Sequence, residues 1–183
     1  MSEIIAVDVD GVVLDLHKIW LQKYNKEYND TLSEENILRW ETHEFVKTDC
    51  GLKIYDYIKD PSIYKIVPPI KSSIEGIKFL KLLAYRIIYV THSYLETSGA
   101  KYNRLLELGF LDRQDDYIEC KDKSLIKSSY LIDDNAENIK SFSGIGIIFT
   151  KPWNKNDNFP FRVDNWHGII ELFKMIEKQK TIK

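Results

Sequence analysis

The stretch from Ile4 to Val13 constrains the fold of this chain more than any other. It reads Ile-Ile-Ala-Val-Asp-Val-Asp-Gly-Val-Val, an apolar run that ends in two aspartates and a glycine. Because side chains alternate between the two faces of a strand, Asp8 and Asp10 are expected on the same side. Two carboxylates that close repel each other unless a cation lies between them, and magnesium with a phosphate fits such a site. A strand followed by a polar Asp-Gly turn is the simpler interpretation, so the downstream sequence has to decide.

The bulk composition is that of a globular protein without a polyanionic partner. The chain has 183 residues, 44% hydrophobic and 30% charged, which suffices for one domain or a core with an insertion. A formal net charge of −2 argues against a nucleic-acid partner. No apolar run approaches the roughly 20 residues that cross a bilayer, and no secretory segment is recognised, so we expect no membrane association. Cys50 and Cys120 form no C-x-x-C pair, which argues against zinc or a disulfide framework and favours the cytoplasm.

Short apolar runs alternate with helical patterns along most of the chain. The predicted strands are Ile4–Asp8, Ile87–Thr91, Tyr130–Asp133, Ile145–Phe149 and, more weakly, Tyr117–Cys120. The predicted helices are Ser72–Ala84, with Ser72 or Ser73 as cap, Leu95–Leu108, ending at Gly109, Ala136–Phe142 and Asn165–Ile176. This alternation predicts an α/β fold, a Rossmann-like parallel sheet with helices on both faces.

Residues 16–69 do not follow that alternation. Leu16 to Tyr24 have the spacing of an amphipathic helix, Thr31-x-x-Glu34 is a capping-box pattern that would start a second helix, and Gly51–Lys59 could form a third. We therefore predict a core of residues 1–15 and 70–183, with a small, mostly helical cap of residues 16–69 inserted after the first strand. Such an insertion can lie over the carboxyl edge of the sheet, where open α/β sheets bind ligands.

Polar residues gather at the carboxyl ends of the predicted strands. In a parallel sheet these ends share one edge, so the side chains that follow them should meet there. That edge would combine four carboxylates, hydroxyls and a lysine, which suits a divalent metal and a phosphate dianion. The residues are Asp8, Asp10, Thr91, Ser93, Lys123, Asp133 and Asp134.

The order of these residues resembles the haloacid dehalogenase (HAD) superfamily of phosphohydrolases: D-x-D-G-V, a strand-end threonine, a lysine and an acidic doublet. Two further stretches resemble its 5′(3′)-deoxyribonucleotidase branch. One is Lys121-Asp122-Lys123-Ser124 followed by Leu131-Ile132-Asp133-Asp134, and the other is Phe149-Thr150-Lys151-Pro152-Trp153-Asn154 followed by Arg162-Val163 and Asn165-Trp166. The resemblance covers about Ile4–Asp15 and Ser72–Ile176 and is weak across the insertion.

The resemblance implies a role for each matching residue. Asp8 would be the nucleophile that becomes an aspartyl-phosphate, and Asp10 would protonate the leaving alcohol and then accept a proton from water. Thr91 would donate its hydroxyl to a phosphoryl oxygen, and Lys123 would offset negative charge. Mg²⁺ would bind Asp8, the main-chain carbonyl of Asp10, and Asp134 as first choice or Asp133 as second. The tight turn after the strand would depend on Gly11.

The residues that contact the rest of the substrate are less well defined. Leu16 stands where the branch carries an aromatic residue, so Trp40, Phe45 or Trp20 could supply stacking faces instead, with Trp40 preferred and Trp20 more consistent with core packing. His92 is either a loop histidine or a substrate contact, and Ser93 is either a helix cap or a phosphate contact. We expect Trp153 and Trp166 to pack the C-terminal segment onto the sheet.

These observations predict a Mg²⁺-dependent phosphomonoesterase that hydrolyses 5′-(deoxy)ribonucleoside monophosphates and is a monomer or a homodimer. Two alternatives remain open: a phosphatase for another small phosphate such as a sugar phosphate, and a HAD-like module that binds nucleotide without turnover. A polynucleotide end phosphatase would need a basic groove, which the net charge of −2 argues against.

Overall fold

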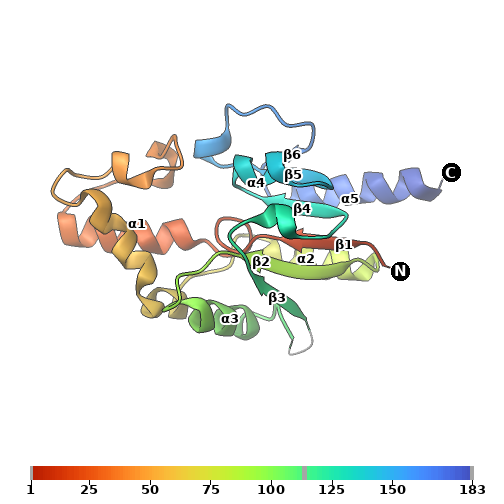
Figure 1. Ribbon diagram of the computed structural model, residues 1–183, viewed down its shortest axis with the longest axis horizontal. Helices are drawn as coiled ribbons and strands as arrows, with labels where there is room; N and C mark the ends of the chain where they lie inside the picture. The colour runs from red at the N-terminus through yellow and green to blue at the C-terminus, as the bar shows by residue number, and fades with distance from the viewer. Residues whose placement is uncertain (1, 113–114, 182–183) are drawn as a thin grey trace.

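The computed structural model of this chain describes residues 2–112 and 115–181. Within these ranges, six strands form one parallel sheet in the order β3-β2-β1-β4-β5-β6 (Figure 1). The strands are β1 (Ile4–Val7), β2 (Arg86–Thr91), β3 (Asp116–Glu119), β4 (Tyr130–Asp133), β5 (Ile145–Phe149) and β6 (Arg162–Val163). All five predicted strands are present, and the two-residue β6 was not predicted because so short a strand carries no hydrophobic period.

Both faces of the sheet are covered, as predicted. Ile5 and Val7 of β1 belong to the larger hydrophobic core, whereas Ala6, between them, belongs to a second core on the other face. The larger core includes Phe173 of α5 (Trp166–Thr181), and the second includes Ile139 of α4 (Ala136–Ser141). Two further α-helices flank β2 in sequence, α2 (Ser73–Leu82) before it and α3 (Ser98–Glu107) after it. None of the helices in the described ranges is both long and apolar enough to span a membrane.

One predicted helix start is confirmed and another is wrong. Helix α2 begins at Ser73 with Ser72 as its N-cap residue, although Ser72 has φ 63° and its side chain makes no capping hydrogen bond. The Ser73 hydroxyl donates to the Ile70 carbonyl at 2.6 Å. Helix α3 starts after Thr97, which excludes Ser93 as its cap. Its predicted end is confirmed, because Gly109 follows with φ 75°.

Residues 16–69 form α1 and a series of short 3₁₀ helices, with no named strand among them. The elements are α1 (Leu16–Tyr28), η1 (Glu34–Asn36), η2 (Thr42–Glu44), η3 (Gly51–Lys59) and η4 (Pro61–Lys65). The capping box is Ser33 with Asn36, not Thr31 with Glu34, and it starts only a single turn. Two more 3₁₀ turns lie at the edge of the sheet, η5 (Lys123–Leu125) and η6 (Pro152–Asn154).

The chain leaves the sheet and returns to it at the same point. The Asp15 amide donates to the Pro68 carbonyl and the Ile70 amide donates to the Val13 carbonyl, both at 2.9 Å. Between these bonds, segment 16–69 lies beyond the carboxyl ends of the strands (Figure 1, orange to yellow). These two hydrogen bonds support our proposal that the chain divides into a core and a cap at this position.

Candidate active site

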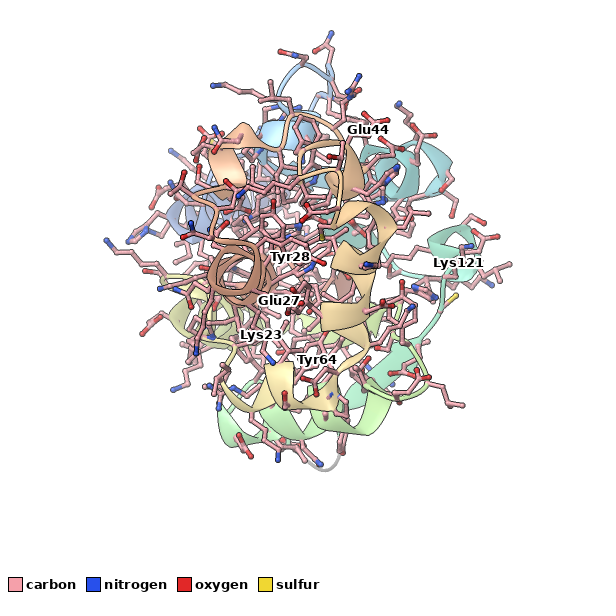
Figure 2. All side chains as sticks on the ribbon, turned by 90° about the vertical axis from the view of Figure 1, so that its left-hand side faces the viewer. Lys23, Glu27, Tyr28, Glu44, Tyr64 and Lys121 are labelled. Carbon is pink, nitrogen blue, oxygen red and sulfur yellow. The ribbon has the colours of Figure 1, made fainter. Side chains whose placement is uncertain are left out.

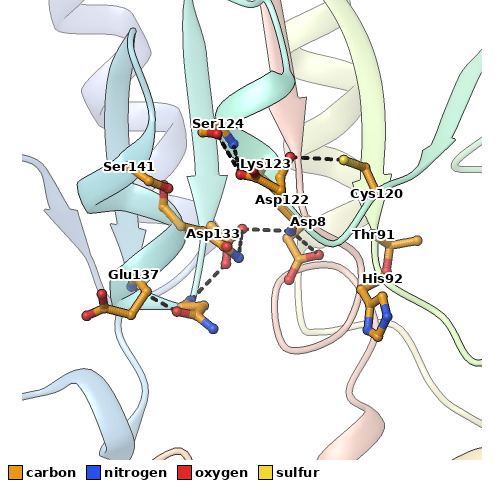
Figure 3. A network of polar contacts seen from close by, with 12 residues as sticks. Asp8, Thr91, His92, Cys120, Asp122, Lys123, Ser124, Asp133, Glu137 and Ser141 are labelled. Atoms are coloured by element: carbon orange, nitrogen blue, oxygen red, sulfur yellow. Dashed lines mark hydrogen bonds and ion pairs between the residues drawn. The ribbon is translucent and has the colours of Figure 1, made fainter.

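Asp8 and Lys123 form a buried ion pair at the carboxyl end of β1. The Asp8 amide donates to the Ile132 carbonyl at 2.9 Å, which fixes Asp8 beside β4. Lys123 Nζ lies 2.6 Å from Asp8 Oδ1 and 2.7 Å from Asp133 Oδ2 (Figure 3). Burial alone would lower the pKa of Lys123, but the charges of Asp133 and Asp8 outweigh it and raise that pKa. Lys123 therefore stays charged beside Asp8.

The two aspartates of the acidic doublet have different surroundings. Asp133 accepts hydrogen bonds from Lys123, from the Asn135 amide at 2.8 Å and from Asn138 Nδ2 at 3.0 Å. Asp134 is equally buried, but its Oδ1 has no hydrogen-bond partner in the described part of the chain. This difference makes Asp134 the better candidate for an external ligand.

Asp8, Asp133 and Asp134 bring one carboxylate oxygen each to within 4.8 Å of the others. Burial, together with the negative charges of Asp8 and Asp133, raises the pKa of Asp134 well above its ordinary value. Burial likewise raises the pKa of Asp133. An acidic cluster with an unpartnered buried oxygen has the oxygen donors that a hard divalent cation such as Mg²⁺ prefers. The residues present therefore fit the ion implied by the sequence.

Gly11 makes room for this cluster. Its φ of 81° is one that other residues rarely adopt, and a Cβ at this position would collide with the Asp134 carboxylate. The predicted turn after the strand is thus present, and it also lets Asp134 approach the main chain. Gly11 itself does not line the cavity described below.

Asp10 is held by two residues that the sequence did not single out. Its Oδ2 lies 2.7 Å from Lys101 Nζ and accepts from the Tyr64 hydroxyl at 3.0 Å, whereas its Oδ1 is buried without a partner in the described residues. Burial raises the pKa of Asp10, and the Lys101 charge partly offsets that shift. One sequence feature could have identified Lys101: it stands four residues before Leu105, so both lie on the buried face of α3.

The end of β2 lies next to Asp10. Thr91 is buried, and its Oγ1 accepts a hydrogen bond from Lys101 Nζ at 2.9 Å. His92 and Ser93 follow and line the same cavity. Burial, followed by the charges of Lys101 and Lys121, lowers the pKa of His92, so its imidazole is neutral near pH 7. The structure therefore brings the strand-end residues of β1 and β2 together as predicted.

A cavity of about 400 Å³ lies over these residues, between the sheet edge and segment 16–69, which covers this side of the molecule (Figure 2). One part of the lining is polar and comes from the strand ends, with carboxylates, hydroxyls and lysines. Another part, which we call the aromatic end, is a cluster of rings in contact with one another: His17, Trp20, Trp40, Tyr55 and Trp153. Leu16, Ile58 and Tyr94 also line the cavity.

The predicted substrate-contacting residues divide into two groups. Leu16 and Trp40 line the cavity, and Trp40 remains 52% exposed. Phe45 does not line it and packs under the Arg39 guanidinium, 5.6 Å from the ring centroid. Trp20 is buried and donates from Nε1 to the Ile54 carbonyl at 2.7 Å, as expected for a core residue, although it also reaches the cavity wall.

Trp153 is not the purely structural residue that we predicted. Its ring lies 4.4 Å from that of His17 and meets the ring of Trp40 edge-on at 6.1 Å, so it joins the aromatic end of the cavity. Burial, together with the charge of Lys151, lowers the pKa of His17 to about 3, which keeps its ring neutral. Trp166 is structural as predicted: it is fully buried and donates to the Val12 carbonyl at 2.7 Å.

Solved hydrolases, among them one of the HAD superfamily, share this fold. A hydrolase from Pseudomonas syringae superposes with a TM-score of 0.60 at 10% identity, covering 96% of this chain and 99% of that one. A HAD-superfamily hydrolase from Ehrlichia chaffeensis gives a TM-score of 0.57 at 13% identity, covering 96% and 98%. At these identities the likeness is one of fold.

Comparison of the sequence with known proteins identifies the family of this chain. Residues 2–180 match the family described as 5′ nucleotidase, deoxy (Pyrimidine), cytosolic type C protein, and the chain belongs to it. It is 28% identical over 177 residues to a 5′(3′)-deoxyribonucleotidase of Clostridium acetobutylicum, covering 94% of this chain and 96% of that protein. It is 30% identical over 171 residues to one of Bacillus subtilis, covering 92% and 97%. The resemblance inferred from the motifs is thereby confirmed.

Proposed function

We propose that this protein hydrolyses the phosphate ester of deoxyribonucleoside 5′-monophosphates through a phosphorylated Asp8. The observation that carries the proposal is the position of the Asp8–Lys123 pair in the polar part of the lining of a cavity of about 400 Å³ that also has an aromatic end. A phosphate fits the polar part and a flat base fits the aromatic end. A sugar phosphate, the alternative substrate, would leave the aromatic wall unused.

Mg²⁺ is the cofactor in this proposal. Asp8, the main-chain carbonyl of Asp10 and Asp134 would hold it, with Asp133 a poorer ligand because its oxygens already accept hydrogen bonds. When bound, the ion supplies positive charge that offsets the charge of the phosphate and the nucleophile. Asp134 Oδ1 is the strongest support for this arrangement, since it is buried and lacks a partner in the described chain.

In the first chemical step, Asp8 attacks phosphorus with Oδ2, the oxygen that Lys123 does not hold. A bond forms between that oxygen and phosphorus while the bond from phosphorus to the nucleoside oxygen breaks. Asp10, protonated at the start of the step, gives its proton to the leaving oxygen, and its raised pKa favours that protonated state. Lys123 and the Thr91 hydroxyl stabilise the negative charge on the transferring group.

In the second step, water attacks the phosphorus of the aspartyl-phosphate. Asp10, now a carboxylate, accepts a proton from that water as the bond from phosphorus to Asp8 breaks. Inorganic phosphate leaves, and both aspartates return to their starting state. The same Asp10 carboxyl thus acts as the general acid in the first step and as the general base in the second.

The nucleophile is tested by Asp8→Asn in the presence of Mg²⁺. The variant keeps the shape of the side chain but lacks the attacking carboxylate, so phosphate release should fall by more than about 10³-fold. Binding of the nucleotide should persist in equilibrium dialysis. A variant that retains turnover would refute the role of Asp8.

The substrate is tested with a panel of deoxyribonucleoside, ribonucleoside and sugar monophosphates assayed for released phosphate. The proposal requires the highest kcat/KM among the deoxyribonucleotides. A preference for sugar phosphates would overturn the substrate while leaving the chemistry intact, and binding without turnover would favour a non-catalytic module. A monomeric or homodimeric state and the cytoplasm remain predictions from the sequence.

A further inference from the structure

We propose that Lys101 and Tyr64 are positioning residues that reserve Oδ1 of Asp10 for proton transfer and make the Thr91 hydroxyl a donor toward the phosphate. The inference rests on the proposed function, because it assigns atoms within the same site. It goes further by naming which oxygen of Asp10 moves the proton and which residues enforce that choice.

Lys101 has no hydrogen left for a substrate. An ammonium group carries three N–H donors and no acceptor. Its Nζ lies 2.7 Å from Asp10 Oδ2, 2.9 Å from Thr91 Oγ1 and 2.9 Å from the His92 carbonyl. The side chain is only 1% exposed. Lys101 therefore acts through its neighbours, unlike Lys123, whose partners in the structure are two carboxylates.

The two oxygens of Asp10 are not equivalent. Oδ2 accepts from both Lys101 and the Tyr64 hydroxyl, so neither of its usual acceptor directions is open to a reacting proton. Oδ1 is buried and has no partner within the described ranges, although Asp10 lines the cavity. The Tyr64 hydroxyl has one hydrogen, and it donates that hydrogen to Oδ2. The proton that Asp10 delivers and recovers is therefore carried on Oδ1.

The same ammonium determines the direction of the Thr91 hydroxyl. Because Lys101 can only donate, Thr91 Oγ1 is the acceptor in their 2.9 Å contact. The hydroxyl hydrogen is left to point elsewhere, and Thr91 lines the cavity. A phosphoryl oxygen in the cavity would receive that hydrogen. One buried lysine thus sets the roles of two groups on neighbouring strands.

The test compares two leaving groups in a single turnover, with Mg²⁺ and rapid mixing. The alkoxide of a deoxyribonucleoside needs a proton to depart, whereas p-nitrophenolate departs without one. Tyr64→Phe removes one hydroxyl, and Lys101→Met removes the three donors at similar length. We expect first-turnover cleavage of the nucleotide to fall about 10-fold in Tyr64→Phe and about 10²-fold or more in Lys101→Met.

With p-nitrophenyl phosphate, Tyr64→Phe should release p-nitrophenolate within about 3-fold of the wild-type rate in the first turnover, because no acid is needed. Lys101→Met should lose at least about 10-fold less rate on this ester than on the nucleotide, and the loss that remains reports the donation by Thr91 to the phosphate. The second step still requires Asp10 as base, so release should appear as a burst of one equivalent followed by slow turnover. Tyr89→Phe is the matched control: it removes a buried hydroxyl, bonded to the Phe110 carbonyl, outside the cavity lining. It should leave both substrates unchanged.

Equal losses on the two substrates would overturn the proposal and make Lys101 and Tyr64 phosphate-binding or structural residues, as would full activity of both variants. If Lys101→Met does not fold, Tyr64→Phe decides alone. Failure of the proposed function has a different signature. In that case wild-type protein cleaves p-nitrophenyl phosphate but no nucleotide, and the comparison is made with glycerol phosphate as the alkyl ester.

Discussion

Asp133 holds the ammonium of Lys123 with an Oδ2–Nζ distance of 2.7 Å and does not line the cavity. Its Oδ1 accepts from the Asn135 amide. Asp134, the next residue, lines the cavity and keeps an oxygen without a partner in the described chain. Two adjacent carboxylates therefore have separate tasks: Asp133 anchors the lysine, and Asp134 is available to a cation.

Asp134→Asn should weaken the response to Mg²⁺, whereas Asp133→Asn should mainly destabilise the fold. We expect the Mg²⁺ concentration for half-maximal activity to rise at least about 10-fold in Asp134→Asn, because a charged oxygen ligand is lost. Asp133→Asn should lower the free energy of unfolding by about 3 kcal/mol, since a buried ion pair loses one partner. Mg²⁺ titrations and urea denaturation measure the two effects. The opposite pattern would show that the tasks are reversed.

The stabilisation of the protein by Mg²⁺ should grow as the pH rises. Burial and neighbouring charges raise the pKa of Asp134 above 3.8, so without metal the folded state binds this proton more tightly than the unfolded state. The tighter binding of this proton stabilises the folded state fully below pH 3.8, and this stabilisation is lost as the pH rises through the raised pKa of Asp134. Mg²⁺ binds the ionised form and opposes that loss.

The measurement is the free energy of unfolding with EDTA and with saturating Mg²⁺ at pH 5 and pH 8. We expect the gain from Mg²⁺ to be larger at pH 8 by about 1 to 2 kcal/mol. Asp134→Asn serves as the control: its gain from Mg²⁺ should be smaller and should differ little between the two pH values, because the titrating carboxyl is absent. If Mg²⁺ raised the free energy of unfolding of the wild type equally at pH 5 and pH 8, the ion would bind at a site other than Asp134.

The strand-end residues could be predicted because they follow from topology alone. Once β1, β2 and β4 are identified as parallel, Asp8, Thr91 and Asp133 must share one edge of the sheet. Lys101 was missed for the opposite reason. It reaches Asp10 only because α3 packs beside that edge, and helical spacing by itself does not distinguish a buried lysine from a solvated one.

The cavity wall was harder to predict, since it depends on how segment 16–69 folds over the sheet. Trp153 follows β5 in a motif that we read as structural, yet contacts with His17 and Trp40 place it in the wall. The capping-box pattern also misled: threonine and serine two residues apart are both acceptable caps, and Ser33 is the one used. Short polar patterns leave such choices to tertiary contacts.

Replacing Trp40 or Trp153 should weaken nucleotide binding with little effect on chemistry. Trp40→Leu and Trp153→Leu each remove an aromatic face from the cavity wall, and one stacking contact contributes about 1 kcal/mol, so KM should rise about fivefold. The first-turnover rate at saturating substrate should remain close to wild type. Steady-state and rapid-mixing kinetics on one deoxyribonucleotide separate the two parameters.

Trp166→Phe is the control for the tryptophan variants, because Trp166 is fully buried outside the cavity lining and donates to the Val12 carbonyl. It should lower the free energy of unfolding by about 1 to 3 kcal/mol and leave KM unchanged. If Trp40→Leu and Trp153→Leu instead lose stability with no change in KM, the base is bound elsewhere and the aromatic end of the cavity is only core.

Gly11→Ala should damage the site more than Gly51→Ala, although both glycines have positive φ. At Gly51, with φ 48°, a Cβ meets nothing within 4 Å, so the cost is the backbone conformation alone, about 1 kcal/mol. At Gly11 the Cβ also strikes the Asp134 carboxylate and must displace it. Local strain of this kind costs at least about 1 kcal/mol, so we expect Gly11→Ala to lose that much more stability than Gly51→Ala. Gly11→Ala should also raise the Mg²⁺ concentration needed for activity. Urea denaturation and Mg²⁺ titration of the two variants test this, and a normal Mg²⁺ response in Gly11→Ala would mean that Asp134 does not need its present position to bind the ion.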